Sequence, residues 1–116
     1  MRVQISPAEL LVGLEAADDA AVWLVAPDRA IVETLDFFPP IVDDAYASGA
    51  IAAANAMSDV YAMGGEVLFA LQIAAWPDDL PLAQLERVFA GAVDLGREAG
   101  GVIAGGHTVS DQEPKF

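Results

Sequence analysis

The stretch ASGAIAAANAMSDVYAMGGE, residues 47–66, decides the fold because it predicts a long helix at the centre of the chain, over about 48–63. Nearly all of its residues are Ala, Ile, Met, Val or Tyr, and a helix that is apolar nearly all round is expected to be buried. Asn55 and Asp59 interrupt the pattern four residues apart, so they share one helical face. A buried, ionised carboxylate is costly unless a cation or several donors meet it. The sequence therefore raises the question of what Asp59 pairs with.

The segments around this helix alternate between strand-like and helix-like patterns. β-branched and aromatic residues predict antiparallel strands at 20–25 and 30–38, and further strands at 66–76 and 102–110. A second, amphipathic helix would have Pro81 in its first turn and end at Gly100-Gly101. Its apolar face would hold Leu82, Leu85, Val88, Phe89, Ala92 and Leu95. The order β-β-α-β-α-β predicts an α/β fold of the α+β sandwich kind, with the helices packed on one face of a mixed sheet.

The length of 116 residues suits one domain. There is no internal repeat and no linker-like segment, so residues 1–116 are expected to form a single domain. Both ends are abrupt, and the last residues, DQEPKF, do not resemble a terminal element. We therefore expect a piece of a longer protein.

The charge and composition argue against several classes of function. Eighteen acidic residues against five basic ones give a net charge of -13, which argues against a nucleic-acid partner because phosphate backbones need Lys and Arg. The absence of Cys excludes disulfides and Cys-bound zinc within these residues, and it is compatible with the cytoplasmic location that we expect. No apolar run reaches the roughly 18 to 20 residues that a membrane span requires, so no membrane partner is expected.

Three groups of carboxylates interrupt the apolar chain, and the first two have a plain structural alternative. Asp18 and Asp19 precede a strand, where a turn would also explain them. Asp36 lies in or at the end of a strand, where Asp is disfavoured unless it caps the strand. Asn55 and Asp59 lie on a helix that has little polar face for them to join, which favours a functional role.

A fourth polar group belongs to the last predicted strand, at 102–110, which is expected to be short and buried and to run into a glycine turn. Gly105 and Gly106 would let backbone N–H groups approach a phosphate, although paired glycines also form ordinary turns. His107, the only histidine, either donates to a phosphate or closes that turn, and Thr108 follows it. The common phosphate loops GxxxxGK[ST] and GxGxxG are absent. Carboxylates with few basic neighbours indicate magnesium, which is usually held by carboxylates, water and substrate phosphates.

Three segments closely resemble the selenide, water dikinase family, whose members are also called selenophosphate synthetases. They are DDAAV at 18–22, TLDFFPPIVDDAYASGAIAAANAMSDVYAMGG at 34–65 and GGHTVSDQEPKF at 105–116. Other enzymes of the aminoimidazole-ribonucleotide synthetase superfamily share the paired Asp and the helix Asp. As a rule they lack the rest of the middle and last segments.

The resemblance implies a reaction, a partner and site residues. ATP, selenide and water would give selenophosphate, AMP and orthophosphate, in an N-terminal ATP-binding domain that forms a homodimer through its sheet. Asp19 and Asp59 match the family's Mg²⁺ ligands. The positions that match ATP-binding residues are Asp18, Asp36, Asp59, Gly106, His107 and Thr108.

Departures from the family pattern keep two alternatives open. Ala16, Ala17 and Ala50 stand where the family usually has polar residues or Arg. The family's reactive Cys or selenocysteine and a catalytic Lys lie upstream of the first segment, and this sequence has no Cys and no Lys before Lys115. A third metal-binding Asp would lie after Phe116. The alternatives are the ATP-binding domain of a thiamine-phosphate kinase-like enzyme and a non-catalytic dimerisation module.

Because these 116 residues lack the nucleophile, we expect no catalytic residue among them and no selenophosphate synthesis by this chain alone. The measurement is AMP release from ATP in the presence of selenide and Mg²⁺. Clear selenide-dependent turnover would refute the expectation.

Overall fold

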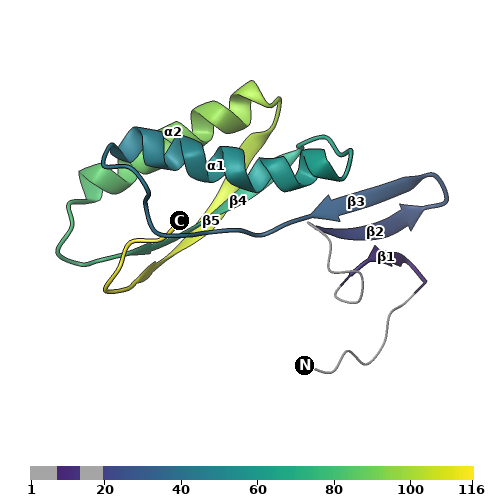
Figure 1. The fold of residues 1–116 in the computed structure, drawn as a ribbon, viewed down its shortest axis with the longest axis horizontal. Coiled ribbons are helices and arrows are strands. Elements are labelled where there is room, and N and C mark those ends of the chain that lie inside the picture. Colours follow the sequence, from purple (N-terminus) through teal and green to yellow (C-terminus); the bar gives the residue numbers. More distant parts are fainter. Residues whose placement is uncertain (1–7, 14–19) are drawn as a thin grey trace. The chain divides into compact units, whose positions relative to one another are not determined.

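The computed structural model describes residues 8–13 and 20–116, which form two compact units. The first unit holds the described residues up to Leu35 together with Met57–Glu66, and the second holds Asp36–Ala56 and Val67–Phe116. The elements in chain order are β1 (Leu10–Val12), β2 (Ala21–Ala26), β3 (Arg29–Glu33), α1 (Ala45–Ala62), β4 (Phe69–Trp76), α2 (Leu82–Glu98) and β5 (Val102–Ser110) (Figure 1). The α+β class is confirmed, and β1 is an additional strand that the sequence did not predict.

The first unit contains an antiparallel sheet in the order β1-β2-β3. The hairpin of β2 and β3 pairs Ala21 with Glu33 and Trp23 with Ile31, which confirms the antiparallel prediction. The predicted extent of the second strand, to residue 38, is wrong, because β3 ends at Glu33. Ala21 is the first residue of β2, so residues beyond its partner Glu33 have no β2 residue to pair with.

The C-terminal end of α1 also belongs to this unit, and it ends as the glycine pair predicts. Gly64 has a positive φ of 76°, which a residue with a side chain rarely adopts. Its N–H donates to the carbonyl of Tyr61 at 2.9 Å, and the N–H of Gly65 donates to that of Val60 at 3.0 Å. These two bonds form a Schellman motif, which satisfies carbonyls that the helix end would leave without partners.

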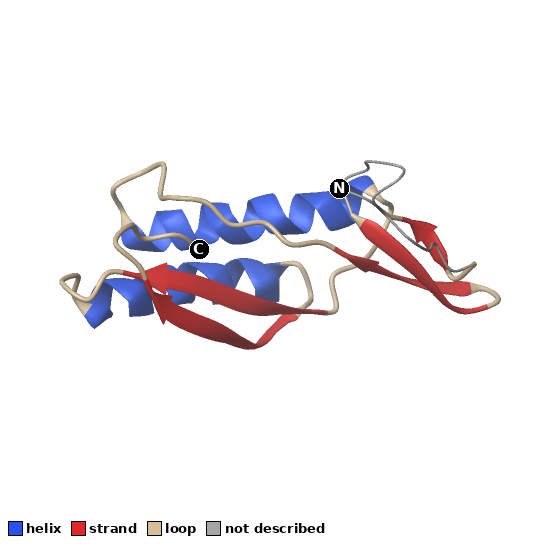
Figure 2. Cartoon of the chain, turned by 90° about the horizontal axis from the view of Figure 1, so that it is seen from below, coloured by secondary structure: helices blue, strands red, loops and turns tan. Residues whose placement is uncertain are grey.

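The second unit is built on the parallel pair β4 and β5, which α2 connects. A parallel pair needs such a crossover because its strands run in the same direction. Both helices lie on one side of β4 and β5, as Figure 2 shows for this unit. The helices therefore cover one face, as expected, but the described strands form two separate sheets where one mixed sheet was expected. The reason is that β4 pairs with β5 and not with the hairpin.

The core of the second unit is small. Ala74, Trp76, Leu85, Val88 and Phe116 form its buried cluster, in which Val88 is 1% exposed. Burial of apolar surface stabilises a fold by about 25 cal/mol per Å², so this cluster contributes to holding α2 on the sheet.

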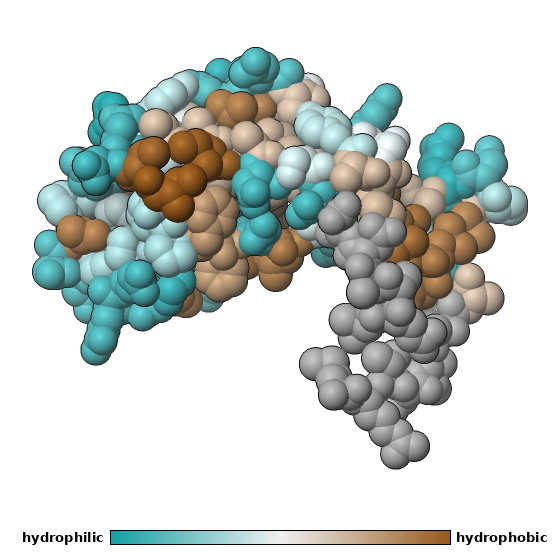
Figure 3. Space-filling view, viewed as in Figure 1, coloured by the Kyte–Doolittle hydropathy of each residue, from teal (hydrophilic) through white to brown (hydrophobic). Residues whose placement is uncertain are grey.

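Two burial predictions are wrong. Within α1 only Ser48 and Gly49 are buried, although the helix is apolar nearly all round. On α2 the predicted core residue Leu82 is 70% exposed, because the helix begins there, directly after Pro81. Hydrophobic surface remains between hydrophilic groups on the side that carries the helices (brown in Figure 3). Neither helix in the described part of the chain has the length and apolar character that crossing a membrane requires.

The two helices approach each other at Gly49 of α1 and Gly91 of α2, both of which are buried. A Cβ atom on Gly49 would overlap the backbone carbonyl of Val88, and one on Gly91 would overlap the carbonyl of Tyr46. The Cβ on Gly91 would also lie 2.8 Å from the backbone nitrogen of Ala50. Backbone atoms cannot move aside as a flexible side chain can, so only glycine fits at these positions.

We predict that Gly91→Ala lowers the free energy of unfolding by about 1 to 3 kcal/mol, the usual range for overpacking, because α1 must move away from α2. Gly96→Ala on the same helix is the matched control. Its Cβ would meet only the side chain of Ile103, at 3.4 Å. The gain in helix propensity of about 0.5–1 kcal/mol should offset that contact. Urea unfolding gives both values, and equal stabilities of the two variants would contradict the prediction.

Candidate functional site

Asp36 and Asn55 form the first polar pair that the sequence singled out. Asp36 lies in the irregular segment between β3 and α1, and Asn55 projects from α1. The Nδ2 of Asn55 donates a hydrogen bond to the Oδ2 of Asp36 at 2.5 Å, and both residues are exposed. The predicted strand position of Asp36 is wrong, because β3 has already ended. A carboxylate has two oxygens and accepts several hydrogen bonds, so Asp36 retains acceptor capacity for a ligand.

Thr34 and Asp59 form the second pair, within the first unit. The Oγ1 of Thr34 donates to the Oδ2 of Asp59 at 3.2 Å, and both residues are half-buried. Asp59 therefore meets a neutral hydroxyl, which leaves the negative charge of the carboxylate in place. Asn55 and Asp59 are four residues apart on α1, so the two pairs depend on the same helix.

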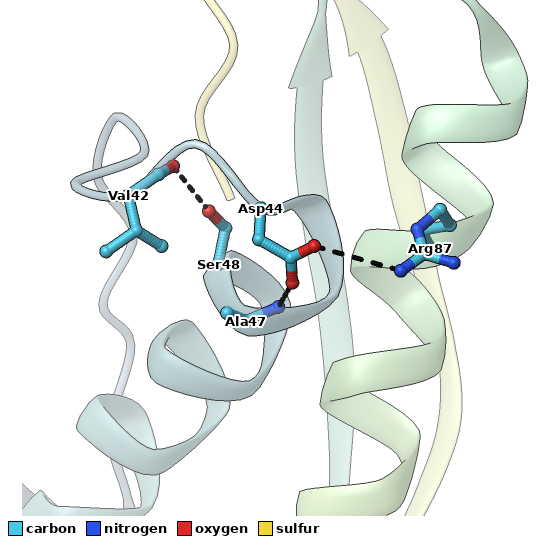
Figure 4. A network of polar contacts seen from close by, with 5 residues as sticks. All are labelled: Val42, Asp44, Ala47, Ser48 and Arg87. Atoms are coloured by element: carbon cyan, nitrogen blue, oxygen red, sulfur yellow. Dashed lines mark hydrogen bonds and ion pairs between the residues drawn. The ribbon is translucent and has the colours of Figure 1, made fainter.

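The start of α1 is held by a polar network that the sequence analysis missed (Figure 4). The Oδ2 of Asp44 accepts the N–H of Ala47 at 2.7 Å, which makes Asp44 the N-cap of the helix. The hydroxyl of Ser48 donates to the carbonyl of Val42 at 3.0 Å. Arg87 of α2 lies 3.8 Å from Asp44, but both side chains are largely exposed, so this ion pair contributes little. An Asp directly before an apolar helical run was the signal that identifies such a cap.

A further contact joins the helices beside the glycine pair. The hydroxyl of Tyr46 on α1 donates to the Oδ2 of Asp94 on α2 at 2.5 Å. This hydrogen bond to a carboxylate raises the pKa of Tyr46 above its ordinary value. The tyrosine therefore stays protonated and keeps its donor role well above neutral pH.

Gly106, His107 and Thr108 lie in β5 and not in a glycine turn, so the predicted turn after that strand is wrong. Gly105 and Gly106 pair with Leu71 and Gln72 of β4, and a Cβ on Gly106 would overlap the carbonyl of Gln72. The close approach of the strands thus explains Gly106. The prediction that β5 is buried is also wrong, since residues 104–110 are exposed.

Asp18 and Asp19 lie outside the described residues, so the predicted metal pair of Asp19 and Asp59 stays a prediction. Within the described ranges, 8–13 and 20–116, no group of three or more His, Asp or Glu side chains could hold a metal ion. Among the described candidate residues, Asp36 and Asp59 each accept a hydrogen bond from a neutral donor. Both donors come from the segment that the sequence marked, TLDFF…NAMSD.

Comparison with known families gives a match over most of the chain. Residues 17–116 match the model of the family described as AIR synthase related protein, N-terminal domain. This range includes every candidate site residue, among them Asp18 and Asp19.

Curated relatives match at high identity. The chain is 56% identical over 108 residues to a selenide, water dikinase of Myxococcus xanthus, which covers 93% of this chain and 31% of that protein. It is 51% identical over 107 residues to a selenide, water dikinase of Agathobacter rectalis, with 92% and 31% covered. The chain thus spans about a third of the length of these relatives.

A solved structure shares the fold. The thiamine monophosphate kinase of Aquifex aeolicus superposes with a TM-score of 0.75 and 23% identity, covering 88% of this chain and 36% of that one. At this identity the likeness shows the fold alone. It supports the α+β arrangement of the elements described above.

Proposed function

Because the chain belongs to the AIR synthase related family through that family's N-terminal domain, we propose that it supplies the nucleotide-binding part of a selenide, water dikinase. The observation that carries this proposal is the high identity to such enzymes over nearly the whole chain, which includes the segment with Asp36 and Asp59. The reaction would convert ATP, selenide and water into selenophosphate, AMP and orthophosphate.

Asp59 is the proposed metal ligand on α1, together with Asp19. Magnesium prefers carboxylate oxygens and reaches substrates through their phosphates, and the oxygen donors of these two residues fit that preference. The hydroxyl of Thr34 orients one oxygen of Asp59 without neutralising it. Mg²⁺ bound there would neutralise the phosphate charge of ATP and organise transfer of the γ-phosphoryl group in line with selenide.

Asp36 is the proposed nucleotide contact in the second unit. Its hydrogen bond from Asn55 fixes one carboxylate oxygen, so the other can accept from a hydroxyl or amino group of the nucleotide. Asp18 and Asp59 are proposed as further ATP contacts.

Gly106, His107 and Thr108 are the remaining proposed ATP-binding residues. Among the described strands β5 pairs only with β4, so it is an edge strand. Alternate backbone N–H groups of an edge strand point away from its neighbour, and such groups can donate to phosphate oxygens. The exposed His107 adds a side-chain donor at the same strand.

The proposed homodimer would use the sheet face that α2 does not cover. Phe69, Leu71 and Val102 on this face are 59% to 65% exposed, and Phe69 is paired directly with Val102. Exposed apolar side chains grouped in this way favour association with a second apolar surface. A second copy of the chain presents the same surface, as a two-fold symmetric interface requires.

We predict that Leu71→Glu makes the chain monomeric, because a charge on this face cannot be buried against its copy without a partner. Leu82→Glu is the control, since Leu82 is equally exposed but lies on α2. Sedimentation velocity distinguishes the monomer from the dimer. A dimer that survives Leu71→Glu, or a wild-type monomer at all concentrations tested, would contradict the proposed interface.

The test of the metal role is Asp59→Asn, which keeps the shape of the side chain and removes its charge. We expect the affinity for ATP in Mg²⁺ to fall at least about tenfold, the loss of one charge-assisted contact, while the unfolding temperature changes little. Asp79→Asn is the control, because it removes the same charge from an exposed carboxylate in the turn between β4 and α2. If both variants bind Mg²⁺-ATP as well as the wild type does, Asp59 is no ligand.

The two alternatives give different results in the same experiments. A thiamine-phosphate kinase-like domain would also bind Mg²⁺-ATP through Asp59, so selenide-dependent turnover by the full-length enzyme decides between them. A non-catalytic dimerisation module would dimerise but show no thermal shift with Mg²⁺-ATP.

A further inference from the structure

Two residues near the C-terminal end of the chain tie the candidate site to the sheet. Lys115 pairs with Ala75 of β4 through two backbone hydrogen bonds, at 2.9 Å and 2.8 Å. Phe116 pairs in the same way with Phe38, at 3.3 Å and 3.2 Å. Successive residues of an extended segment present their backbone groups to opposite sides. Lys115 and Phe116 therefore act as a short strand between the edge of β4 and the segment that contains Asp36.

Side chains hold this short strand in place. Phe116 is 6% exposed and belongs to the buried cluster with Trp76, Leu85 and Val88. The Nζ of Lys115 donates to the Oδ2 of Asp111 at 3.1 Å, which lowers the pKa of that carboxyl below its ordinary value. The core contact is the stronger anchor, because the ion pair is partly exposed.

Asp36 lies close to this anchor, in a segment that is also held nearer its two ends, at Thr34 and at Val42. The residues between β3 and α1 form neither helix nor strand, and Asp36 is only two residues from Phe38. The carboxylate of Asp36 is thus set by two contacts from outside its segment: the side chain of Asn55 and, through the backbone, the pair of Phe38 with Phe116.

We propose that Lys115 and Phe116 are positioning residues, which hold the carboxylate of Asp36 where it contacts the nucleotide. This inference rests on the proposed function for the identity of the ligand. The anchoring of the Asp36 segment by Lys115 and Phe116 does not rest on the proposed function, because it follows from contacts within the protein.

The first test compares Lys115→Pro with Lys115→Ala in this chain. Both remove the ion pair with Asp111, but only proline removes the N–H that donates to Ala75. In the protein without nucleotide, we expect hydrogen exchange at the amide of Phe38 to accelerate at least about tenfold in Lys115→Pro relative to Lys115→Ala, the usual effect of losing a backbone bond. Amides within α2 should exchange alike in the two variants. Equal exchange rates at Phe38 in the two variants would show that the backbone of Lys115 does not anchor the Asp36 segment.

The second test measures affinity for ATP in Mg²⁺ by calorimetry in the same two variants. We expect the Kd of Lys115→Pro to be about five to ten times that of Lys115→Ala, as for one weakened polar contact. Equal Kd values, with wild-type binding intact, would overturn the positioning role. A wild type that does not bind Mg²⁺-ATP refutes the proposed function and with it the role in binding, and the exchange experiment still decides whether the segment is held.

A separate pair of variants covers the case in which Lys115→Pro does not fold. Phe116→Ala removes the core anchor and Phe116→Leu keeps most of its apolar volume, so the first should show the faster exchange at Phe38 and the higher Kd. Val88→Ala, which opens the same core but leaves Phe116 in place, controls for loss of stability. The proposal would be overturned if the exchange rate at Phe38 and the Kd for Mg²⁺-ATP changed only in proportion to the loss of stability across the three variants.

Discussion

The close approach of α1 and α2 at Gly49 and Gly91 is the constraint on which the second unit depends. Interhelical distances are set by the side chains at the contact, and at Gly49 and Gly91 there is no side chain. The backbones meet directly, and the polar contacts from Asp44 to Arg87 and from Tyr46 to Asp94 lie on the same side of α1. Because a helix is stiff, fixing it at Gly49 also fixes Asn55 further along. The hydrogen bond from Asn55 to Asp36, within the second unit, therefore depends on two residues without side chains.

Local patterns in the sequence predicted the elements well, because those elements depend on local forces. The apolar run and the Gly64-Gly65 pair predict α1 and its end, and the structure confirms both. Contacts between distant segments could not be read in this way. Gly49 looks like one more small residue in a helix, and its requirement for glycine comes from Val88, far along the chain. Phe38 has the propensity for a strand, but its pairing partner is Phe116 and not a residue of β2.

The candidate site shows the same division between local and distant information. Residue type and spacing singled out Asp36, Asn55 and Asp59, and the resemblance to a family gave them roles. The pairing of donors with carboxylates depends on the tertiary structure. Asn55 donates a hydrogen bond to Asp36, and Thr34 donates one to Asp59. Gly106 was singled out for a phosphate turn, yet it lies within β5, where the carbonyl of Gln72 leaves no room for a side chain. A pair of glycines predicts close approach of the backbone but not what approaches it.

Asp59 keeps its negative charge in the structure, since the hydrogen bond that it accepts from Thr34 is from a neutral group. Its observed donor is a neutral hydroxyl, as the donor to Asp36 is a neutral amide, and the chain carries a net charge of -13. An anion as highly charged as ATP should be repelled from such a surface unless a divalent cation accompanies it. Calorimetric titration of this chain with ATP, in Mg²⁺ and in excess chelator, tests this directly. We expect ATP to bind only in Mg²⁺, and equal affinity with Mg²⁺ and with chelator would contradict a metal-dependent site.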